Sequence, residues 1–149
     1  MVSSINDRRR AVLQTPISEH MISAEKVAHV QAGNYAGHAL LVLTKSGYSA
    51  IPVLDSSFRL KGLISIGMIT DAILGLERIE YERLDSIEVD SIMDGNLPEV
   101  YVHDPFEKGL DLLVNHTFLC VTEEDGTFAG ILTRRVMLKE FKKYIYTTP

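Results

Sequence analysis

The sequence predicts an α+β protein built from two copies of one unit, and an internal repeat is the main observation behind this prediction. The stretch 47–65 begins Gly-Tyr-Ser-Ala-Ile-Pro-Val and returns as the stretch 115–133, which begins Asn-His-Thr-Phe-Leu-Cys-Val. An offset of 68 residues, from Gly62 to Gly130, aligns the two stretches without a gap. Because the copies of a repeat pack against one another, this duplication indicates the architecture before any single residue does.

The first copy predicts the order strand, helix, strand, strand, helix. Apolar residues recur at helical spacing from Tyr35 to Lys45, and Gly47 follows where a helix stop is expected. The predicted elements are an extended segment over 26–30, a helix over 35–45, strands over 48–54 and 60–65, and a helix over 66–76. Such a unit leaves one sheet face exposed, and two such sheets can bury each other.

The second copy predicts the same order. Its lead-in Val89–Met93 mirrors Ile17–Met21 at an offset of 72 residues, so the part before the paired strands is four residues shorter than in the first copy. Asp104 as N-cap and Pro105 at the first helical position predict the start of its first helix. Strands are predicted over 118–121 and 128–132, and a final helix over 134–144.

The predicted boundaries follow from the repeat and from one acidic stretch. The acidic stretch lies between the copies and is typical of a solvated linker. The chain is accordingly divided into a lead-in over 1–16, a first copy over 17–76, a linker over 77–88, a second copy over 89–145 and a tail over 146–149.

Bulk composition limits the possible functions. A net charge of −5 argues against non-specific nucleic-acid binding, which needs a basic face. Every apolar run is interrupted too early to cross a bilayer. The only cysteine, Cys120, rules out an intramolecular disulfide and suits a reducing compartment. We expect a cytoplasmic protein without membrane or nucleic-acid partners, in which Cys120 is a core residue; a reactive thiol is the alternative.

Nothing in the sequence predicts catalysis. The five histidines lie at no metal-ligand spacing, and none pairs with an expected nucleophile. Neither a Walker loop nor a G-x-G-x-x-G motif is present. We expect a non-catalytic protein with no metal and no cofactor, and a small enzyme of unrecognised kind is the competing hypothesis.

Three repeated features resemble a tandem pair of CBS domains, the arrangement called a Bateman module. They are the doubled lead-in that ends in Met21 and Met93, the Gly-Tyr-Ser-Ala-Ile-Pro-Val strand, and the doubled Gly-h-h-Ser/Thr turn into a helix. The resemblance implies two CBS repeats packed about a pseudo-twofold axis and a disc-like homodimer. The dimer contact is expected on apolar helix faces that include Ala36, Leu40, Leu43, Ile69, Ile73 and Leu76.

Within that family, four segments resemble the small stand-alone proteins of Firmicutes that bind cyclic di-AMP, the DarB/CbpB type. These segments are 26–30, 40–48, 75–80 and 133–136. The resemblance implies an adenine-nucleotide receptor for signal transduction. It also implies that the unliganded form binds the stringent-response synthetase/hydrolase Rel, and that cyclic di-AMP suppresses this contact.

The resemblance further implies a nucleotide cleft that joins the two repeats. Its expected residues are Lys26, Val27, Ala28, Tyr48, Ser49, Ala50, Ile51, Pro52, Thr133, Arg134 and Arg135. Thr133 would cap the last helix, whose N-terminal N–H groups attract phosphate. Arg134 and Arg135 would bind phosphate through their guanidinium groups, and Lys26 would add a third charge. Tyr48 would stack on a purine, while backbone groups of Ala28 and Ala50 would read its hydrogen-bonding edge.

Structural interpretations of the same residues, without a bound ligand, remain as alternatives. The two arginines can form a solvated surface pair, or a pair salt-bridged to Glu140 or to the acidic residues of the linker. Lys26 can be a solvated lysine and Tyr48 a half-buried strand aromatic. The equivalent second cleft has Ile66 and Gly67 in place of the arginines and is expected to be empty or only apolar.

One departure from the family pattern favours a cyclic dinucleotide. Met68 and Val136 stand where AMP- or ATP-binding repeats carry an aspartate that holds the ribose hydroxyls. A cyclic dinucleotide has its 3′-oxygen in a phosphodiester, so it needs this carboxylate less and needs cations more. Cyclic di-AMP is therefore the expected ligand. An AMP- or ATP-sensing module and a ligand-free structural interaction module are the alternatives.

Overall fold

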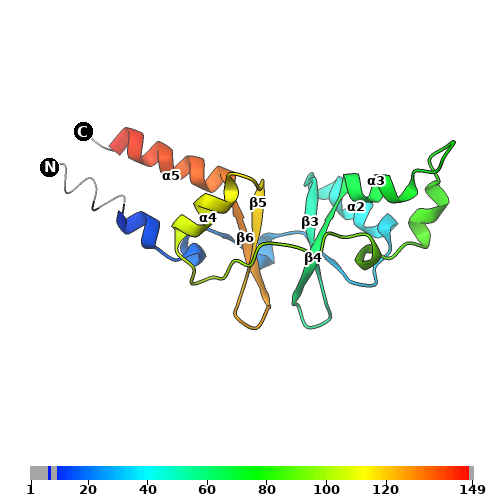
Figure 1. Cartoon of the computed structure of the whole chain (residues 1–149), viewed down its shortest axis with the longest axis horizontal. Coiled ribbons are helices and arrows are strands. Elements are labelled where there is room, and N and C mark those ends of the chain that lie inside the picture. Colours follow the sequence, from blue (N-terminus) through cyan, green and yellow to red (C-terminus); the bar gives the residue numbers. More distant parts are fainter. Residues whose placement is uncertain (1–6, 8–9, 148–149) are drawn as a thin grey trace. The chain divides into compact units, whose positions relative to one another are not determined.

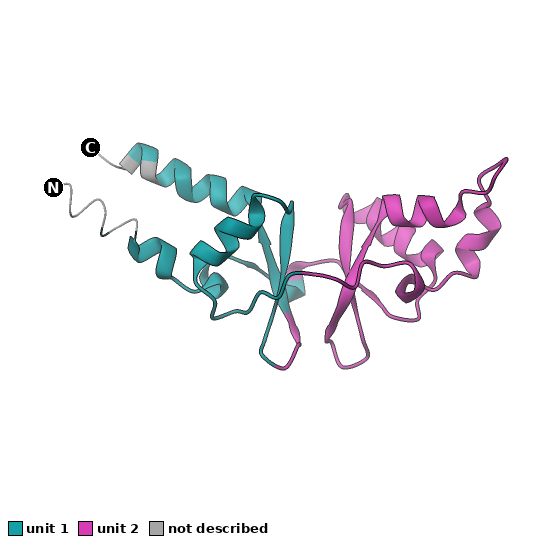
Figure 2. Cartoon of the chain, viewed as in Figure 1, with its two compact units in different colours: residues 1–25, 98–124, 129–149 teal, residues 26–97, 125–128 magenta. Residues whose placement is uncertain are grey.

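The computed structural model describes residues 7 and 10–147, which fall into two compact units (Figure 2). Unit 1 consists of residues 1–25, 98–124 and 129–149, and unit 2 consists of residues 26–97 and 125–128. Each unit has its own three-stranded sheet and its own apolar core. The prediction of a mixed helix-and-strand fold with two repeats is confirmed.

Unit 2 is a sheet with two α-helices on one of its sides (Figure 1). The strand order is β2-β3-β4, in which β2 runs parallel and β4 antiparallel to β3. The elements along the chain are η2 (Ala24–Lys26), β2 (Val30–Gln31), α2 (Ala36–Ser46), β3 (Ala50–Leu54), β4 (Leu60–Ser65), α3 (Ile66–Ile73), η3 (Tyr81–Asp85) and η4 (Val89–Ser91), where η denotes a short 3-10 helix.

The helices of unit 2 form where the sequence supplies a buried stripe and end groups. Ala39 and Leu43 of α2 have no exposed surface, and they pack with Ile51 of β3. Gly47 ends α2 in the left-handed conformation (φ 77°) and donates its N–H to the Leu43 carbonyl at 3.0 Å. The Ser65 hydroxyl accepts the Met68 N–H at 3.1 Å and so caps the start of α3.

Unit 1 also has a three-stranded sheet, with the strand order β1-β6-β5, but its first strand, β1, runs antiparallel to β6. Phe106 and Leu113 of α4 pack with Leu119, Val121 and Leu132 of the sheet to form its core. The elements are η1 (Ile17–Glu19), β1 (Ile22–Ser23), α4 (Phe106–Leu113), β5 (Phe118–Thr122), β6 (Phe128–Thr133) and α5 (Arg134–Thr147), and both α-helices lie on one side of the sheet (Figure 1).

The lead-in segments of the two copies have exchanged places. Ile17, from the first copy, is buried in the core of unit 1, whereas Val89, its equivalent in the second copy, is buried in the core of unit 2. Ile22 of β1 pairs with Ile131, and Asp94 pairs with Leu63 at the equivalent position. Each sheet therefore receives a short antiparallel neighbour from the other copy.

This exchange explains why each copy carries a glycine in its second paired strand. A Cβ added at Gly62 would lie 2.7 Å from the Asp94 carbonyl oxygen and 2.7 Å from the Met93 sulfur. A Cβ at Gly130 would overlap the Ile22 carbonyl oxygen and lie 3.2 Å from the Met21 sulfur. Only glycine lets the exchanged backbone approach this closely.

Three local predictions were wrong in part. The helix expected over 66–76 ends at Ile73, because the chain reverses there and Glu80 donates its N–H to the Ile73 carbonyl at 2.7 Å. The extended segment expected over 26–30 is a strand only at Val30–Gln31. Asp104 is not the N-cap of α4; Pro105 is, and the Asp104 carboxylate accepts the Tyr101 N–H at 2.8 Å and pairs with Lys108 at 2.9 Å.

The residues expected to form a dimer contact are mostly core residues. Ala36, Leu43 and Ile69 are buried in the core of unit 2, and Ile73 is only 5% exposed. Leu76, in contrast, is fully exposed in the turn after α3. A dimer contact on unit 2 would therefore have to use exposed side chains rather than the buried helix stripe.

Candidate functional site

The predicted site residues of unit 2 lie at one end of its sheet. Val30 of β2 is opposite Val53 of β3 in parallel register, so the segments that precede both residues run to the same end. Ser65, at the end of β4, pairs with Ala50 at this end as well. The structure thus brings Lys26–Ala28 and Tyr48–Pro52 to the same end of one sheet, as a binding site requires.

These residues differ in what they can offer to a ligand. Val27 and Ile51 are buried (6% and 1% exposed), and Pro52 is buried too, so their side chains shape the sheet end from inside. Lys26, Tyr48 and Ser49 are exposed, and Ala28 and Ala50 are half-buried. The Ser49 carbonyl already accepts the Ile66 N–H at 3.1 Å. Tyr48 is 39% exposed, which leaves part of its ring surface available for stacking.

The predicted site residues of unit 1 lie where β6 passes into α5. Thr133 is the last residue of β6, and its hydroxyl accepts the Val136 N–H at 3.3 Å. The prediction that Thr133 caps this helix is confirmed. The positive end of the helix dipole and the first N–H groups of α5 lie at this point, which favours an anion.

The two arginines that follow Thr133 do different things. The Arg134 guanidinium donates to three backbone carbonyls near the end of α4: Nε to Leu113 at 3.0 Å and to His116 at 3.1 Å, and Nη2 to Val114 at 3.2 Å. Arg135 is exposed in the first turn of α5. Arg134 is exposed too, so the two arginines differ in their hydrogen-bond partners and not in their exposure. The sequence gives one sign of this, because no glycine ends α4.

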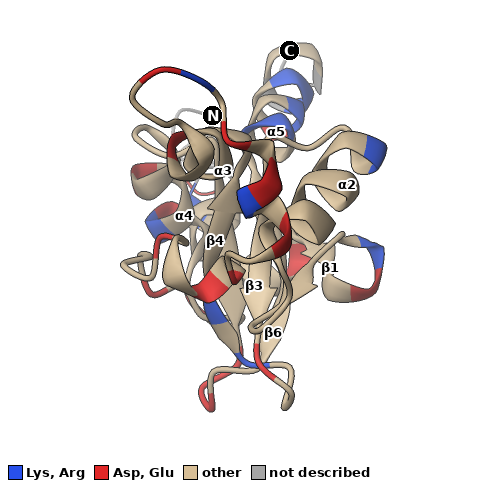
Figure 3. Ribbon diagram, turned by 90° about the vertical axis from the view of Figure 1, so that its right-hand side faces the viewer, with Lys and Arg blue, Asp and Glu red and all other residues tan. Residues whose placement is uncertain are grey.

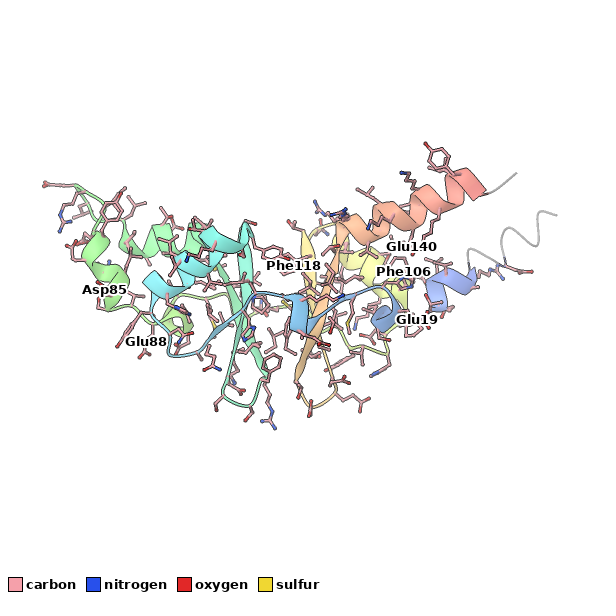
Figure 4. All side chains as sticks on the ribbon, turned by 180° about the vertical axis from the view of Figure 1, so that it is seen from behind. Glu19, Asp85, Glu88, Phe106, Phe118 and Glu140 are labelled. Atoms are coloured by element: carbon pink, nitrogen blue, oxygen red, sulfur yellow. The ribbon has the colours of Figure 1, made fainter. Side chains whose placement is uncertain are left out.

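Glu140 is not the partner of the arginines. Its carboxylate lies 3.6 Å from His20 Nδ1 and 3.6 Å from Lys143 Nζ. Figure 4 shows Glu140 on α5 and Phe106 on the neighbouring α4, and the His20 ring packs against the Phe106 ring in a tilted arrangement at 4.4 Å between centroids. Basic residues nevertheless gather along α5 (Figure 3), among them Arg135, Lys139 and Lys142. The start of α5 is thus electropositive even though the whole chain is acidic.

The only thiol of the chain is buried and poorly ionised. Cys120 is buried at 8% exposure, and burial raises the pKa of its thiol to about 12, so the thiolate needed for nucleophilic attack is scarce at neutral pH. Over residues 7 and 10–147, no group of three or more His, Cys, Asp or Glu side chains could hold a metal ion. No helix within the same residues is long and apolar enough to cross a membrane.

Comparison with known proteins gives a consistent picture. The family model for the CBS domain matches residues 17–75 and again residues 89–143. The chain is 50% identical over 145 residues, 97% of each chain, to a Bacillus subtilis protein named cyclic di-AMP receptor B. It is 55% identical to Listeria monocytogenes CbpB in a crystal structure with c-di-AMP, with a TM-score of 0.83 over 89% of this chain and 98% of that one.

A second solved structure agrees. A CBS domain-containing protein of Bacillus anthracis is 53% identical, with a TM-score of 0.84 over 91% of this chain and 98% of that chain. More distant structures, such as a CbpB bound to c-di-AMP at 23% identity, share the fold.

Proposed function

Because the chain belongs to the CBS domain family, we propose that it is a non-catalytic receptor that binds cyclic di-AMP and regulates a protein partner. The observation that carries the proposal is the start of α5. There, a capping threonine, a helix N-terminus and the exposed Arg135 stand together in a chain that is 50% identical to a cyclic di-AMP receptor.

The proposed roles follow from what each residue exposes. Arg135 and the first N–H groups of α5 bind a phosphate, with a charge-assisted contact from the guanidinium. Lys26 supplies a second cation, and Tyr48 stacks on an adenine. Half-buried Ala28 and Ala50 present backbone groups to the adenine edge, and Val27, Ile51 and Pro52 hold that backbone in place from the core. Small side chains at 28 and 50 leave room for the base.

A cyclic dinucleotide fits these groups better than AMP or ATP. Met68 and Val136 offer no carboxylate for free ribose hydroxyls, whereas two phosphodiesters need cations and helix N–H groups. An AMP- or ATP-sensing module is the second candidate. Its support is the CBS fold itself, since CBSX2, a structure in complex with AMP, shares that fold at 22% identity.

Titration calorimetry with cyclic di-AMP, cyclic di-GMP, AMP and ATP tests the ligand. We expect micromolar or tighter binding of cyclic di-AMP and at least tenfold weaker binding of the others, a difference of about 1.4 kcal/mol. Absence of heat with cyclic di-AMP would contradict the proposal. Tighter binding of AMP than of cyclic di-AMP would favour the second candidate instead.

The partner and the oligomeric state belong to the same proposal. We expect a homodimer that binds a Rel-type synthetase/hydrolase when unliganded and releases it when cyclic di-AMP binds. Such a switch requires different ligand affinities of the two states. A pull-down with and without cyclic di-AMP measures this, and equal capture in both conditions contradicts the switch.

A further inference from the structure

The first helices of the two copies end in different ways. In unit 2, α2 ends at Gly47, whose left-handed backbone turns the chain and whose N–H reaches the Leu43 carbonyl. In unit 1, α4 ends at Val114 in the ordinary right-handed conformation (φ −59°, ψ −40°). Asn115 stands where the repeat places Gly47, and it donates its N–H back to Leu112 at 3.2 Å. The carbonyls at the end of α4 therefore lack the glycine cap.

Arg134 supplies the missing cap from a distance. Its guanidinium donates to the carbonyls of Leu113, Val114 and His116 at 3.0–3.2 Å, which are the last carbonyls of α4 and of the turn after it. A positive charge at a helix C-terminus is favourable because that end of the dipole is negative. In the first copy the equivalent residue is Ile66, so the arginine is present in the copy without the glycine and absent from the copy with it.

The contact of Arg134 with the end of α4 also compensates one of the two positive charges at the start of α5. Two cations in the first turn of a helix oppose the positive end of its dipole. Both side chains are exposed, but the Arg134 charge is compensated by three carbonyls, whereas the Arg135 charge faces solvent beside the capping Thr133. Arg135 is therefore the member of the pair that a bound anion would compensate.

We infer that Arg134 is a positioning residue, which ties the first turn of α5 to the end of α4 and so orients Thr133 and Arg135 toward the ligand. The inference rests on the proposed function, since it assigns Arg135 to the ligand phosphate. Arg134 acts through these carbonyls, which hold its Nε and Nη2 groups, rather than as the main contact to the phosphate.

Four variants separate positioning from direct contact: Arg134→Met, Arg134→Lys, Arg135→Met and the control Lys139→Met, which removes an exposed charge from the same helix. For cyclic di-AMP, we expect Arg134→Met to weaken binding about tenfold, as supporting residues commonly do. Arg134→Lys should recover part of the lost affinity, since an ammonium group can replace some of the hydrogen bonds that the guanidinium donates. Arg135→Met should weaken binding about 30-fold, and Lys139→Met less than twofold.

The salt dependence of the affinity tells the two arginines apart. Arg135→Met removes a charge that meets the phosphate, so its affinity should vary less with salt than that of the unmodified protein. Arg134→Met should keep the original salt dependence while binding more weakly. Two results would overturn the inference: unchanged affinity of Arg134→Met, or a loss of salt dependence equal to that of Arg135→Met.

Backbone hydrogen exchange provides a readout that needs no ligand. We expect Arg134→Met, but neither Arg135→Met nor Lys139→Met, to speed exchange at the amides of residues 114–117 and 136. If cyclic di-AMP fails to bind the unmodified protein, the proposed function falls, and unchanged exchange in Arg134→Met would separately remove the tie between α4 and α5.

Discussion

The starts of α3 and α5 show which features the duplication has kept and which differ between the two copies. Ser65 accepts the Met68 N–H at 3.1 Å and Thr133 accepts the Val136 N–H at 3.3 Å, so both helices begin with the same cap. The next two residues are Ile66-Gly67 in one copy and Arg134-Arg135 in the other. The two copies thus share the helix cap, which folding needs. They differ in the two positive charges that follow it, which are present only in the second copy.

The largest effect on stability should come from replacing the glycine against which the exchanged lead-in packs, a feature that both copies share. Gly130→Val would place side-chain atoms against the Ile22 carbonyl and the Met21 sulfur, which would push the exchanged lead-in away from β6. We expect a loss of about 3 kcal/mol or more of unfolding free energy, or no folded protein. Urea unfolding measures this.

The matched control is Gly67→Ala in α3. A Cβ there meets only the Ser65 hydroxyl at 3.8 Å, so the variant should be neutral or more stable by up to about 1 kcal/mol. Equal destabilisation by both substitutions would contradict the role assigned to the exchanged lead-in.

The next largest effect should be on ligand affinity and should come from removing Arg135, which the first copy lacks. Arg135→Gly gives the second copy the residue that the first copy has at Gly67. We expect cyclic di-AMP affinity to fall about 30-fold or more, because a charge-assisted phosphate contact is lost. Calorimetry measures the affinity and circular dichroism confirms the fold. Retained affinity with an intact fold would remove Arg135 from the site.

The third comparison concerns Cys120, which occupies the place of Pro52 in the repeat. Burial raises its thiol pKa to about 12 in the folded protein, well above the ordinary value of about 8.5. The folded state thus holds this proton more tightly, so the associated stability is complete below about pH 8.5 and is lost as the pH rises toward 12.

Cys120→Val isolates this contribution, because valine is apolar and does not titrate. Between pH 8 and pH 10 we expect the unmodified protein to lose on the order of 2 kcal/mol more unfolding free energy than the variant. Urea unfolding at both values measures it. Parallel losses in the two proteins would show that the thiol ionises normally.

The smallest effect should come from the shared caps. Ser65→Ala and Thr133→Ala should each cost about 1 kcal/mol of unfolding free energy. Only Thr133→Ala should also weaken cyclic di-AMP binding, because only that helix start faces the proposed phosphate. Thermal unfolding and calorimetry on both variants measure the pair of effects, and equal losses of affinity would assign the ligand to both copies.

Local patterns predicted most of the fold. The repeat and its turn residues placed β4 at Leu60–Ser65 without error and placed Gly47 as the end of α2, because these features depend on neighbours in the chain. The exchanged lead-ins could not be predicted in the same way. The offset of 72 shows that Ile17–Met21 and Val89–Met93 are equivalent, but it does not show that each packs with the sheet of the other copy.

The candidate site was predictable in its residue types and less so in their roles. Thr133 was recognisable as a cap from its place before a helix. Arg134 and Arg135 look alike in the sequence, and they differ only because the carbonyl partners of Arg134 lie 18 to 21 residues earlier in the chain. No local pattern marks such a partner except the missing glycine at the end of α4.

The most direct test of the difference between the copies is the stoichiometry of cyclic di-AMP binding by calorimetry. One ligand per chain, abolished or greatly weakened by Arg135→Met and untouched by Gly67→Ala, is the result expected if only the second copy supplies the phosphate-binding helix start. Two ligands per chain, or none, would contradict this account.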